Sequence, residues 1–240
     1  VLKNLQKGDV VDFINLGKKV GEITIDEVFT INRDQRLHNI YGTSDPLHPG
    51  VRNTAERLGE IAISGEYTIN YPLIQDNINR VQNMKIKTGA NFVSSMMLSA
   101  NPLNRAHERM IRQAISDSDL LVIFLRKPFT NDGLRYDIRY NALSTFVENF
   151  LPRNKVIIIP FENSYMFSGY NELVIDALLS KNFGCDQLVV GKNHGGLGLY
   201  YDKNKLNSVF DHSENIDIQI KTIDEYVYCD TCKTLVSTTT

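Results

Sequence analysis

Residues 93–116 read VSSMMLSANPLNRAHERMIRQAIS. The stretch opens with an apolar run, which ends at a small-residue turn and a proline, Pro102. After the proline, apolar residues recur at the three- and four-residue intervals of an amphipathic helix. This order predicts a buried strand that leads directly into a helix. Three polar side chains, Asn101, Asn104 and His107, lie where the strand passes into the helix.

The same alternation of strand and helix continues along the chain. Apolar strands are expected at 91–98, 119–125, 155–161 and 187–191, and helices at 104–117, 133–149, 169–182 and about 202–211. The strands are apolar throughout rather than at every second position, which indicates burial on both faces and a parallel sheet. We therefore predict a Rossmann-like α/β domain over residues 71–215, with its sites at the carboxyl ends of the strands.

The flanking segments differ in character. Residues 1–70 contain VVDFIN (10–15) and VGEITIDEVFTI (20–31), whose β-branched and aromatic residues predict strands. We interpret residues 1–70 as a partial N-terminal β-rich domain. Residues 216–240 are expected to form a C-terminal strand and a short segment that contains Cys-x-x-Cys.

Composition sets broad limits on the partners and the compartment. The 240 residues are 42% hydrophobic and 22% charged, with a formal net charge of −2, which gives no general attraction to nucleic acid. No apolar run reaches the roughly 18 residues of a membrane span. Three cysteines do not make a disulfide framework, so a reducing cytoplasmic location is expected.

The first expected site lies at the start of the helix after Pro102, which we expect to begin near Leu103. Asn104 and His107 are three residues apart and share a helix face, and Asn101 precedes them. Free backbone N–H groups and the positive end of the helix dipole favour a phosphate at this position. The alternative interpretation is that Asn101 or Asn104 only caps the helix and that His107 is an ordinary surface residue.

The second expected site is GKNHGGLG (191–198), at the end of the strand at 187–191. Backbone amides, a cation and an imidazole at a strand end suit an anion. The candidate ligands are Gly191, Lys192, His194, Gly195 and Gly196. The alternative is a flexible loop whose glycines provide positive φ angles.

Cys229 and Cys232 form a Cys-x-x-Cys pair, which is half of a zinc knuckle. Two cysteines by themselves are a weak metal signal, because a structural zinc site needs four ligands. Arg135 and Arg139 lie four residues apart on the helix expected at 133–149, where a solvated or salt-bridged face is the simpler interpretation.

The two histidine-bearing segments resemble the catalytic domain of the ATP sulfurylase (sulfate adenylyltransferase) family. NPLNRAHE (101–108) is similar to the family's Asn-Pro-x-x-Arg-Ala-His-Glu, and GKNHGG (191–196) to its Gly-Arg-Asp-His-Ala-Gly. YGTSDPLHPGV (41–51), SKNFGC (180–185) and the C-terminal YCDTC also resemble family segments. The resemblance extends from about residue 8 to 240 and implies a small PUA-like domain, a nucleotidyltransferase domain and a zinc-knuckle-like end.

The resemblance implies that ATP and sulfate react to adenosine 5′-phosphosulfate and pyrophosphate, with Mg²⁺ on the ATP phosphates. Asn101, His107 and Lys192 would be the catalytic residues. Asn101, Asn104, His107 and the 191–196 loop would bind the nucleotide. A homo-oligomer is implied too. A third cysteine and a histidine beyond Thr240 would complete a structural zinc site in a full-length protein.

The oxyanion pocket departs from the family pattern. Leu98 replaces the family's glutamine, Ala100 its arginine, and Asn104 its first histidine. Each charge-assisted hydrogen bond lost from a bound anion removes about 1.5–3 kcal/mol. Arg126 could reach the emptied pocket from a neighbouring strand end, although a solvated loop cation is an equal possibility. Two alternatives therefore stay open: an adenylyltransferase for another acceptor, and an inactive nucleotide-binding homologue.

Overall fold

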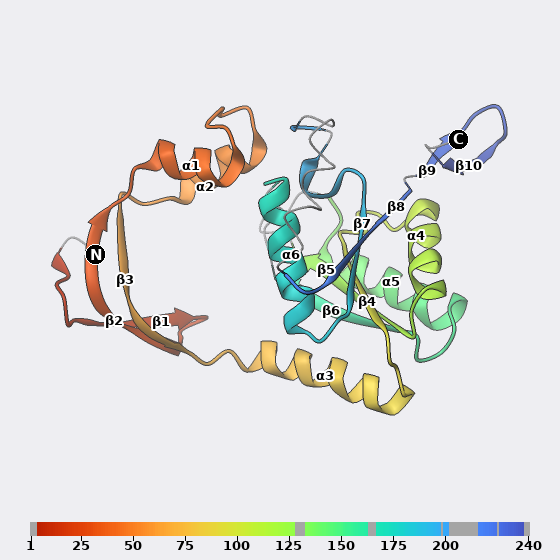
Figure 1. Cartoon of the computed structure of the whole chain (residues 1–240), viewed down its shortest axis with the longest axis horizontal. Helices are drawn as coiled ribbons and strands as arrows, with labels where there is room; N and C mark the ends of the chain where they lie inside the picture. Colours follow the sequence, from red (N-terminus) through yellow and green to blue (C-terminus); the bar gives the residue numbers. More distant parts are fainter. Residues whose placement is uncertain are drawn as a thin grey trace. The chain divides into compact units, whose positions relative to one another are not determined.

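The computed structural model describes residues 4–127, 133–162, 167–197, 199–201, 216–224 and 226–237. The chain divides into two compact units, Val1–Asp76 and Asn77–Thr240 (Figure 1). None of the described helices is both long and apolar enough to cross a membrane.

The first unit is built on an antiparallel sheet with strand order β1-β2-β3. Its strands are β1 (Val10–Asn15), β2 (Lys18–Thr30) and β3 (Ile61–Ile69). Leu16 and Gly17 join β1 to β2 with φ angles of 50° and 78°. Two consecutive positive φ angles match the right-handed twist of the paired strands, which is why a two-residue loop suffices.

Two short helices, α1 (Arg33–Tyr41) and α2 (Pro49–Arg57), lie between β2 and β3 in the chain. Asn32 caps α1 by accepting from the Gln35 N–H at 3.0 Å, and the buried His48 caps α2 through Nδ1 at 3.3 Å from the Val51 nitrogen. α1 is not among the elements that we expected from the sequence. The buried apolar residues of this unit are Ile23, Ile25, Leu37, Tyr41 and Val51.

The second unit contains a five-stranded sheet with order β6-β5-β4-β7-β8, and all of its strand pairs are parallel. The strands are β4 (Val93–Leu98), β5 (Leu120–Lys127), β6 (Val156–Glu162), β7 (Gln187–Gly191) and β8 (Gln219–Ile223). The predicted parallel sheet is confirmed. β8 falls in the segment that we had assigned to the C-terminal end, and it forms the fifth strand.

Helices cover both faces of this sheet (Figure 1). They are α3 (Pro72–Thr88), α4 (Arg105–Ser116), α5 (Tyr136–Phe150) and α6 (Tyr170–Asn182). Ile111 of α4 and Leu143 of α5 pack with Leu98 and Ile123 on one face. Val81 of α3 and Leu173 of α6 pack on the other face. Two faces are available because successive side chains of a strand point to opposite sides. The helix expected at about 202–211 lies outside the described residues.

The C-terminal end forms an antiparallel hairpin of β9 (Tyr226–Cys229) and β10 (Thr234–Ser237). Cys229 is paired with Thr234 in its ladder, and Cys232 lies in the connecting turn. The Cys-x-x-Cys segment is therefore carried by a hairpin end.

Candidate functional site

The two expected sites lie at one edge of the sheet because their strands are direct neighbours. β4 pairs with β7 in parallel, with Met96 opposite Val189. The turn after β4, which holds Asn101, and the loop after β7, which holds His194, therefore leave the sheet at adjacent carboxyl ends. This is the edge at which open α/β sheets bind their ligands.

The turn after β4 is fastened to the chain just before α5. Ala100 is 1% exposed and has a φ angle of 47°, and the Asn101–Pro102 peptide bond is cis. Asn101 Oδ1 accepts the Leu134 N–H at 2.9 Å. A Cβ at Gly133 would lie 2.2 Å from Asn101 Nδ2, so only glycine leaves room for this side chain. The side-chain oxygen Oδ1 of Asn101 thus holds the turn in place.

Asn104 and His107 form a capping box at the start of α4. Asn104 Oδ1 accepts from the Ala106 and His107 nitrogens at 3.0 and 3.1 Å, and His107 Nδ1 accepts the Asn104 N–H at 3.2 Å. The helix begins at Arg105, not at residue 103 or 104, and Asn104 is its cap. The alternative interpretation, in which Asn104 caps the helix, therefore holds for the side-chain oxygen of Asn104.

The capping box also determines which nitrogen of His107 carries the proton. Since Nδ1 accepts a hydrogen bond, the neutral ring holds its hydrogen on Nε2. Burial lowers the pKa of His107 below its usual value because the charged form is less well solvated. Nε2–H is thus the donor that His107 can offer to a phosphate oxygen.

The loop after β7 packs closely against the start of α6. Gly195 and Gly196 have φ angles of 64° and 82°. Gly169 N–H donates to the Gly195 oxygen at 2.8 Å, and a Cβ on Gly195 would lie 2.6 Å from the Gly169 oxygen. Both glycines are therefore required by backbone conformation and by packing within the protein.

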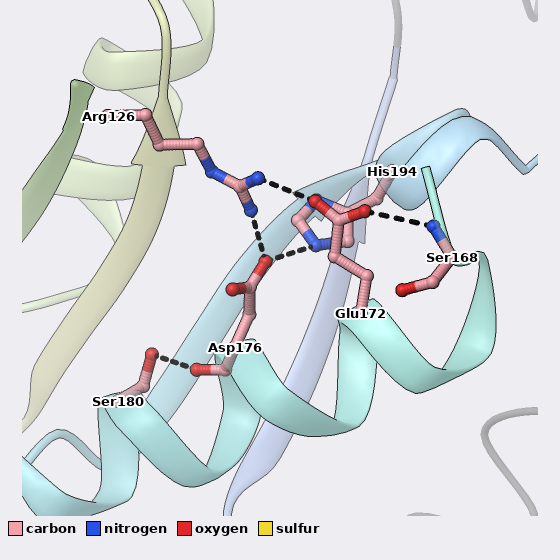
Figure 2. A network of polar contacts seen from close by, with 6 residues as sticks. All are labelled: Arg126, Ser168, Glu172, Asp176, Ser180 and His194. Atoms are coloured by element: carbon pink, nitrogen blue, oxygen red, sulfur yellow. Dashed lines mark hydrogen bonds and ion pairs between the residues drawn. The ribbon is translucent and has the colours of Figure 1, made fainter. Parts of the chain in front are cut away.

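A buried charge network joins this loop to β5 and α6 (Figure 2). Arg126 donates from Nη1 to Glu172 Oε1 and from Nη2 to Asp176 Oδ2, both at 2.5 Å. His194 Nε2 lies 2.9 Å from the same Asp176 oxygen. Since a carboxylate only accepts, His194 donates from Nε2 and leaves Nδ1 for other contacts.

This network changes the interpretation of Arg126. Its side chain is 3% exposed and bonded to two carboxylates that are 2% and 0% exposed. A guanidinium in these bonds is already neutralised and does not face an oxyanion. Arg126 connects β5 to α6, which differs from both expected roles, the oxyanion ligand and the solvated loop cation.

Leu98, Ala100 and Lys192 occupy contrasting environments at the same edge. Leu98 and Ala100 are 4% and 1% exposed and belong to the core cluster under α4 and α5. They add no polar group to the edge. Lys192 is 40% exposed, with Nζ 3.3 Å from Asp224 Oδ1, and Gly191 ends β7 beside it. Lys192 is thus an accessible cation that a ligand phosphate could share with Asp224.

Arg139 has surroundings that the sequence interpretation did not anticipate. Instead of a solvated or salt-bridged face, it is 3% exposed and has no ion pair within the described part of the chain. Its Nη1 donates to the Ser99 oxygen at 3.0 Å, and its Cζ lies 5.9 Å from the Tyr136 ring centroid. Arg139 is therefore, after Arg126, a second buried arginine, and it lies beside the turn after β4.

Some of these groups could have been found from spacing. Glu172 and Asp176 are four residues apart on α6, and their apolar neighbours Leu173 and Ala177 show that this face is buried. Two acids on a buried helix face require a cation, because unpaired buried charges are strongly disfavoured. Nothing in the local sequence says that the cation is Arg126.

The cysteine pair fits two of the four ligands of a structural zinc. Cys232 N–H donates to Cys229 Sγ at 3.4 Å, and hydrogen bonds from Cys232 lower the pKa of the Cys229 thiol. A lowered thiol pKa favours the thiolate that binds metal. The described ranges contain no group of three or more His, Cys, Asp and Glu residues placed to hold a metal ion.

Comparison with known proteins gives consistent similarities for both units. A sequence model of the ATP-sulfurylase family matches residues 75–240, and one of a PUA-like domain matches residues 1–70. The sulfate adenylyltransferase of Psychrobacter cryohalolentis is 28% identical over 98% of this chain. That of Symbiobacterium thermophilum is 29% identical over 92% of it. The chain spans 58% of the length of each of these relatives.

Among solved structures, the hexameric APS kinase from Thiobacillus denitrificans is similar in fold. It aligns with 98% of this chain and 41% of its own chain at a TM-score of 0.64 and 13% identity. At this identity the likeness concerns the fold alone.

Proposed function

Because the chain belongs to the ATP-sulfurylase family, we propose that it is the nucleotidyl-transferring part of a sulfate adenylyltransferase. The reaction would join ATP and sulfate into adenosine 5′-phosphosulfate and pyrophosphate. The observation that carries the proposal is the parallel pairing of β4 with β7. This pairing brings the turn that holds Asn101, followed by the start of α4 with His107, to the same sheet edge as the loop that holds Lys192 and His194.

The proposed chemistry is one in-line displacement at the α-phosphorus, in which a sulfate oxygen attacks and pyrophosphate leaves. Such a reaction needs positioning and charge stabilisation more than covalent participation by the protein. His107 would donate from Nε2 and Lys192 would provide a positive charge to the phosphates. Asn101 would act by holding the turn, since its oxygen is bonded to Leu134. The amides around Gly195 and Gly196 would line the loop side.

The remaining groups of the nucleotide site are assigned in the same way. Gly191 would allow the backbone to approach the phosphates, and the His194 ring, held by Asp176, would present Nδ1. Asn104 would support the nucleotide through the capping box rather than by its side-chain oxygen, which accepts two backbone N–H groups. Mg²⁺ would neutralise the ATP phosphates. Zinc at Cys229 and Cys232, a homo-oligomer and a cytoplasmic location stay predictions.

Pyrophosphate release tests the proposal directly. The chain is incubated with ATP, Mg²⁺ and one acceptor at a time: sulfate, selenate, molybdate, phosphate or none. We expect release that depends on sulfate. Release only with another acceptor would contradict sulfate as the substrate, and ATP binding without any release would contradict an adenylyltransferase.

Two lysines of similar exposure provide a matched comparison. Lys192→Ala should lower sulfate-dependent turnover by about tenfold or more, because one charge-assisted contact to the transition state is lost. Lys181→Ala removes a cation of similar exposure, 42%, which pairs with Asp217. It should leave turnover unchanged. Equal turnover in both variants would exclude Lys192 from the reaction.

A further inference from the structure

Two arginines near the carboxyl edge of the sheet are equally buried, at 3% exposure, but differ in their partners. Arg126 is bonded to two carboxylates. Arg139 forms no ion pair with any described residue, and its Nη1 donates to a neutral carbonyl, that of Ser99. Among the described residues, carboxylates therefore balance Arg126, whereas none pairs with Arg139.

An unbalanced guanidinium inside a protein is unfavourable. Arginine does not deprotonate in proteins, so it cannot escape the desolvation penalty by losing its charge. That penalty amounts to several kcal/mol for an ion without a compensating partner. Arg139 Nε is also buried and has no hydrogen-bond partner among the described residues. Such an atom is a donor that a water or an ion with an acceptor oxygen can satisfy.

A second donor without a partner lies beside the first. Tyr136 is one turn earlier on α5, with its ring centroid 5.9 Å from Arg139 Cζ. Its Oη is buried and has no hydrogen-bond partner in the described part of the chain. Burial raises the pKa of Tyr136 to about 12, so the phenol keeps its proton at neutral pH. Both unsatisfied atoms are therefore donors, and an acceptor with several oxygens could bond to both.

The position of this pair relates it to the transfer reaction. Arg139 contacts the residue directly after β4, and the next residue, Ala100, adds only a methyl group. Asn101, one residue further, ties the same turn to Leu134 just before α5. Arg139 thus contacts the turn that we assign to the nucleotide phosphates, and Tyr136 lies beside Arg139.

We propose that Arg139 and Tyr136 bind the oxyanion that attacks the nucleotide, a small tetrahedral dianion such as sulfate. The assignment rests on the proposed function and names the residues that receive the acceptor. The dianion would be the negatively charged partner of Arg139 and would accept hydrogen bonds from Arg139 Nε and Tyr136 Oη. A phosphate group of ATP shares this chemistry, and the test separates the two.

Calorimetric titration of sulfate into the full chain, with and without a non-hydrolysable ATP analogue, measures the acceptor site. Tyr136→Phe removes one hydroxyl and should weaken sulfate binding about tenfold. Arg139→Met should weaken it by at least about a hundredfold, and Arg139→Lys should restore part of the loss. The affinity for the ATP analogue alone should stay unchanged in all three variants.

Control variants separate binding from structural damage. Tyr136→Phe should keep its thermal midpoint, since the lost hydroxyl has no partner in the described structure. It therefore remains informative if Arg139→Met fails to fold. Arg135→Met removes an exposed arginine that pairs with Asp137. Tyr140→Phe removes the hydroxyl of the tyrosine whose ring contacts Tyr136. Both should bind sulfate like the unchanged chain.

Several results would overturn the assignment. These are the absence of binding of sulfate, selenate and phosphate to the unchanged chain, and unchanged sulfate affinity in Tyr136→Phe and Arg139→Met. A parallel loss of affinity for the ATP analogue would assign the pair to the nucleotide instead. If turnover is absent but the variants lose sulfate binding, the proposed function fails and this site stands. Turnover with an unchanged KM for sulfate in both variants would support the proposed function and exclude Arg139 and Tyr136 as the acceptor site.

Discussion

At the scale of single residues, the site is organised by which atoms the protein has already used. The Asn104 oxygen and His107 Nδ1 are bonded to the backbone at the start of α4. Asn101 Oδ1 is bonded to Leu134. Of the polar trio after β4, His107 therefore offers Nε2–H to a ligand, while both asparagine oxygens maintain the local fold.

The pKa of His107 predicts a pH dependence of stability. Its folded-state pKa is lowered, so below about pH 6.5 the unfolded chain takes up a proton that the folded chain resists. The free energy of unfolding should fall as the pH drops from about 6.5 to the folded pKa and then level off. His107→Gln keeps a capping-box residue and should remove this contribution.

Urea unfolding of the chain between pH 5 and pH 8 measures this effect. Asn104→Ser retains an oxygen for the cap and should keep the pH dependence of the unchanged chain. An identical pH profile for His107→Gln and the unchanged chain would mean that burial of His107 does not affect its protonation.

At the scale of elements, α6 is attached to the sheet by charge as well as by apolar packing. Glu172 and Asp176 both face Arg126 of β5, and Asp176 also holds His194 of the loop after β7 (Figure 2). Ser168 N–H donates to Glu172 Oε2 at 3.3 Å, which extends the network to the residues before α6. One network therefore joins three elements near the carboxyl edge.

Removal of one network member should be strongly destabilising. Asp176→Ala leaves Arg126 buried with an incomplete set of partners, which is expected to lower the free energy of unfolding by about 3–5 kcal/mol. Glu162→Ala disrupts the half-exposed pair with Lys127 at the end of the same sheet and should lower it by about 1 kcal/mol or less. Chemical denaturation measures both, and similar losses would contradict a special role for burial.

At the scale of the whole molecule, the chain consists of two units with separate cores. Ile25 is fully buried in the first unit, and Leu125 is fully buried in the second. Units that have their own cores are expected to unfold as separate cooperative units.

Core truncations test this separation. Ile25→Ala should destabilise the first unit, and Leu125→Ala the second, each by about 2–5 kcal/mol. Hydrogen exchange followed by mass spectrometry reports the two units separately in one sample. Faster exchange in both units after either substitution would show that they unfold together.

From the sequence alone we predicted the parallel α/β sheet, the succession along the chain of its first four strands and the helices between them, and two loops at the carboxyl ends of strands. These features follow from local periodicity and from turn residues that act over short distances. α1 was missed because its residues are mostly polar, with Leu37 and Tyr41 as its buried members.

Only the tertiary structure decided which charges meet. Glu172 and Asp176 lie 46 and 50 positions after Arg126, so no local pattern pairs them with it. The same holds for Arg139, which is 40 positions from Ser99. Whether a buried arginine is balanced by carboxylates or left for a ligand depends on how strands and helices pack, because burial and electrostatic pairing are properties of the folded chain.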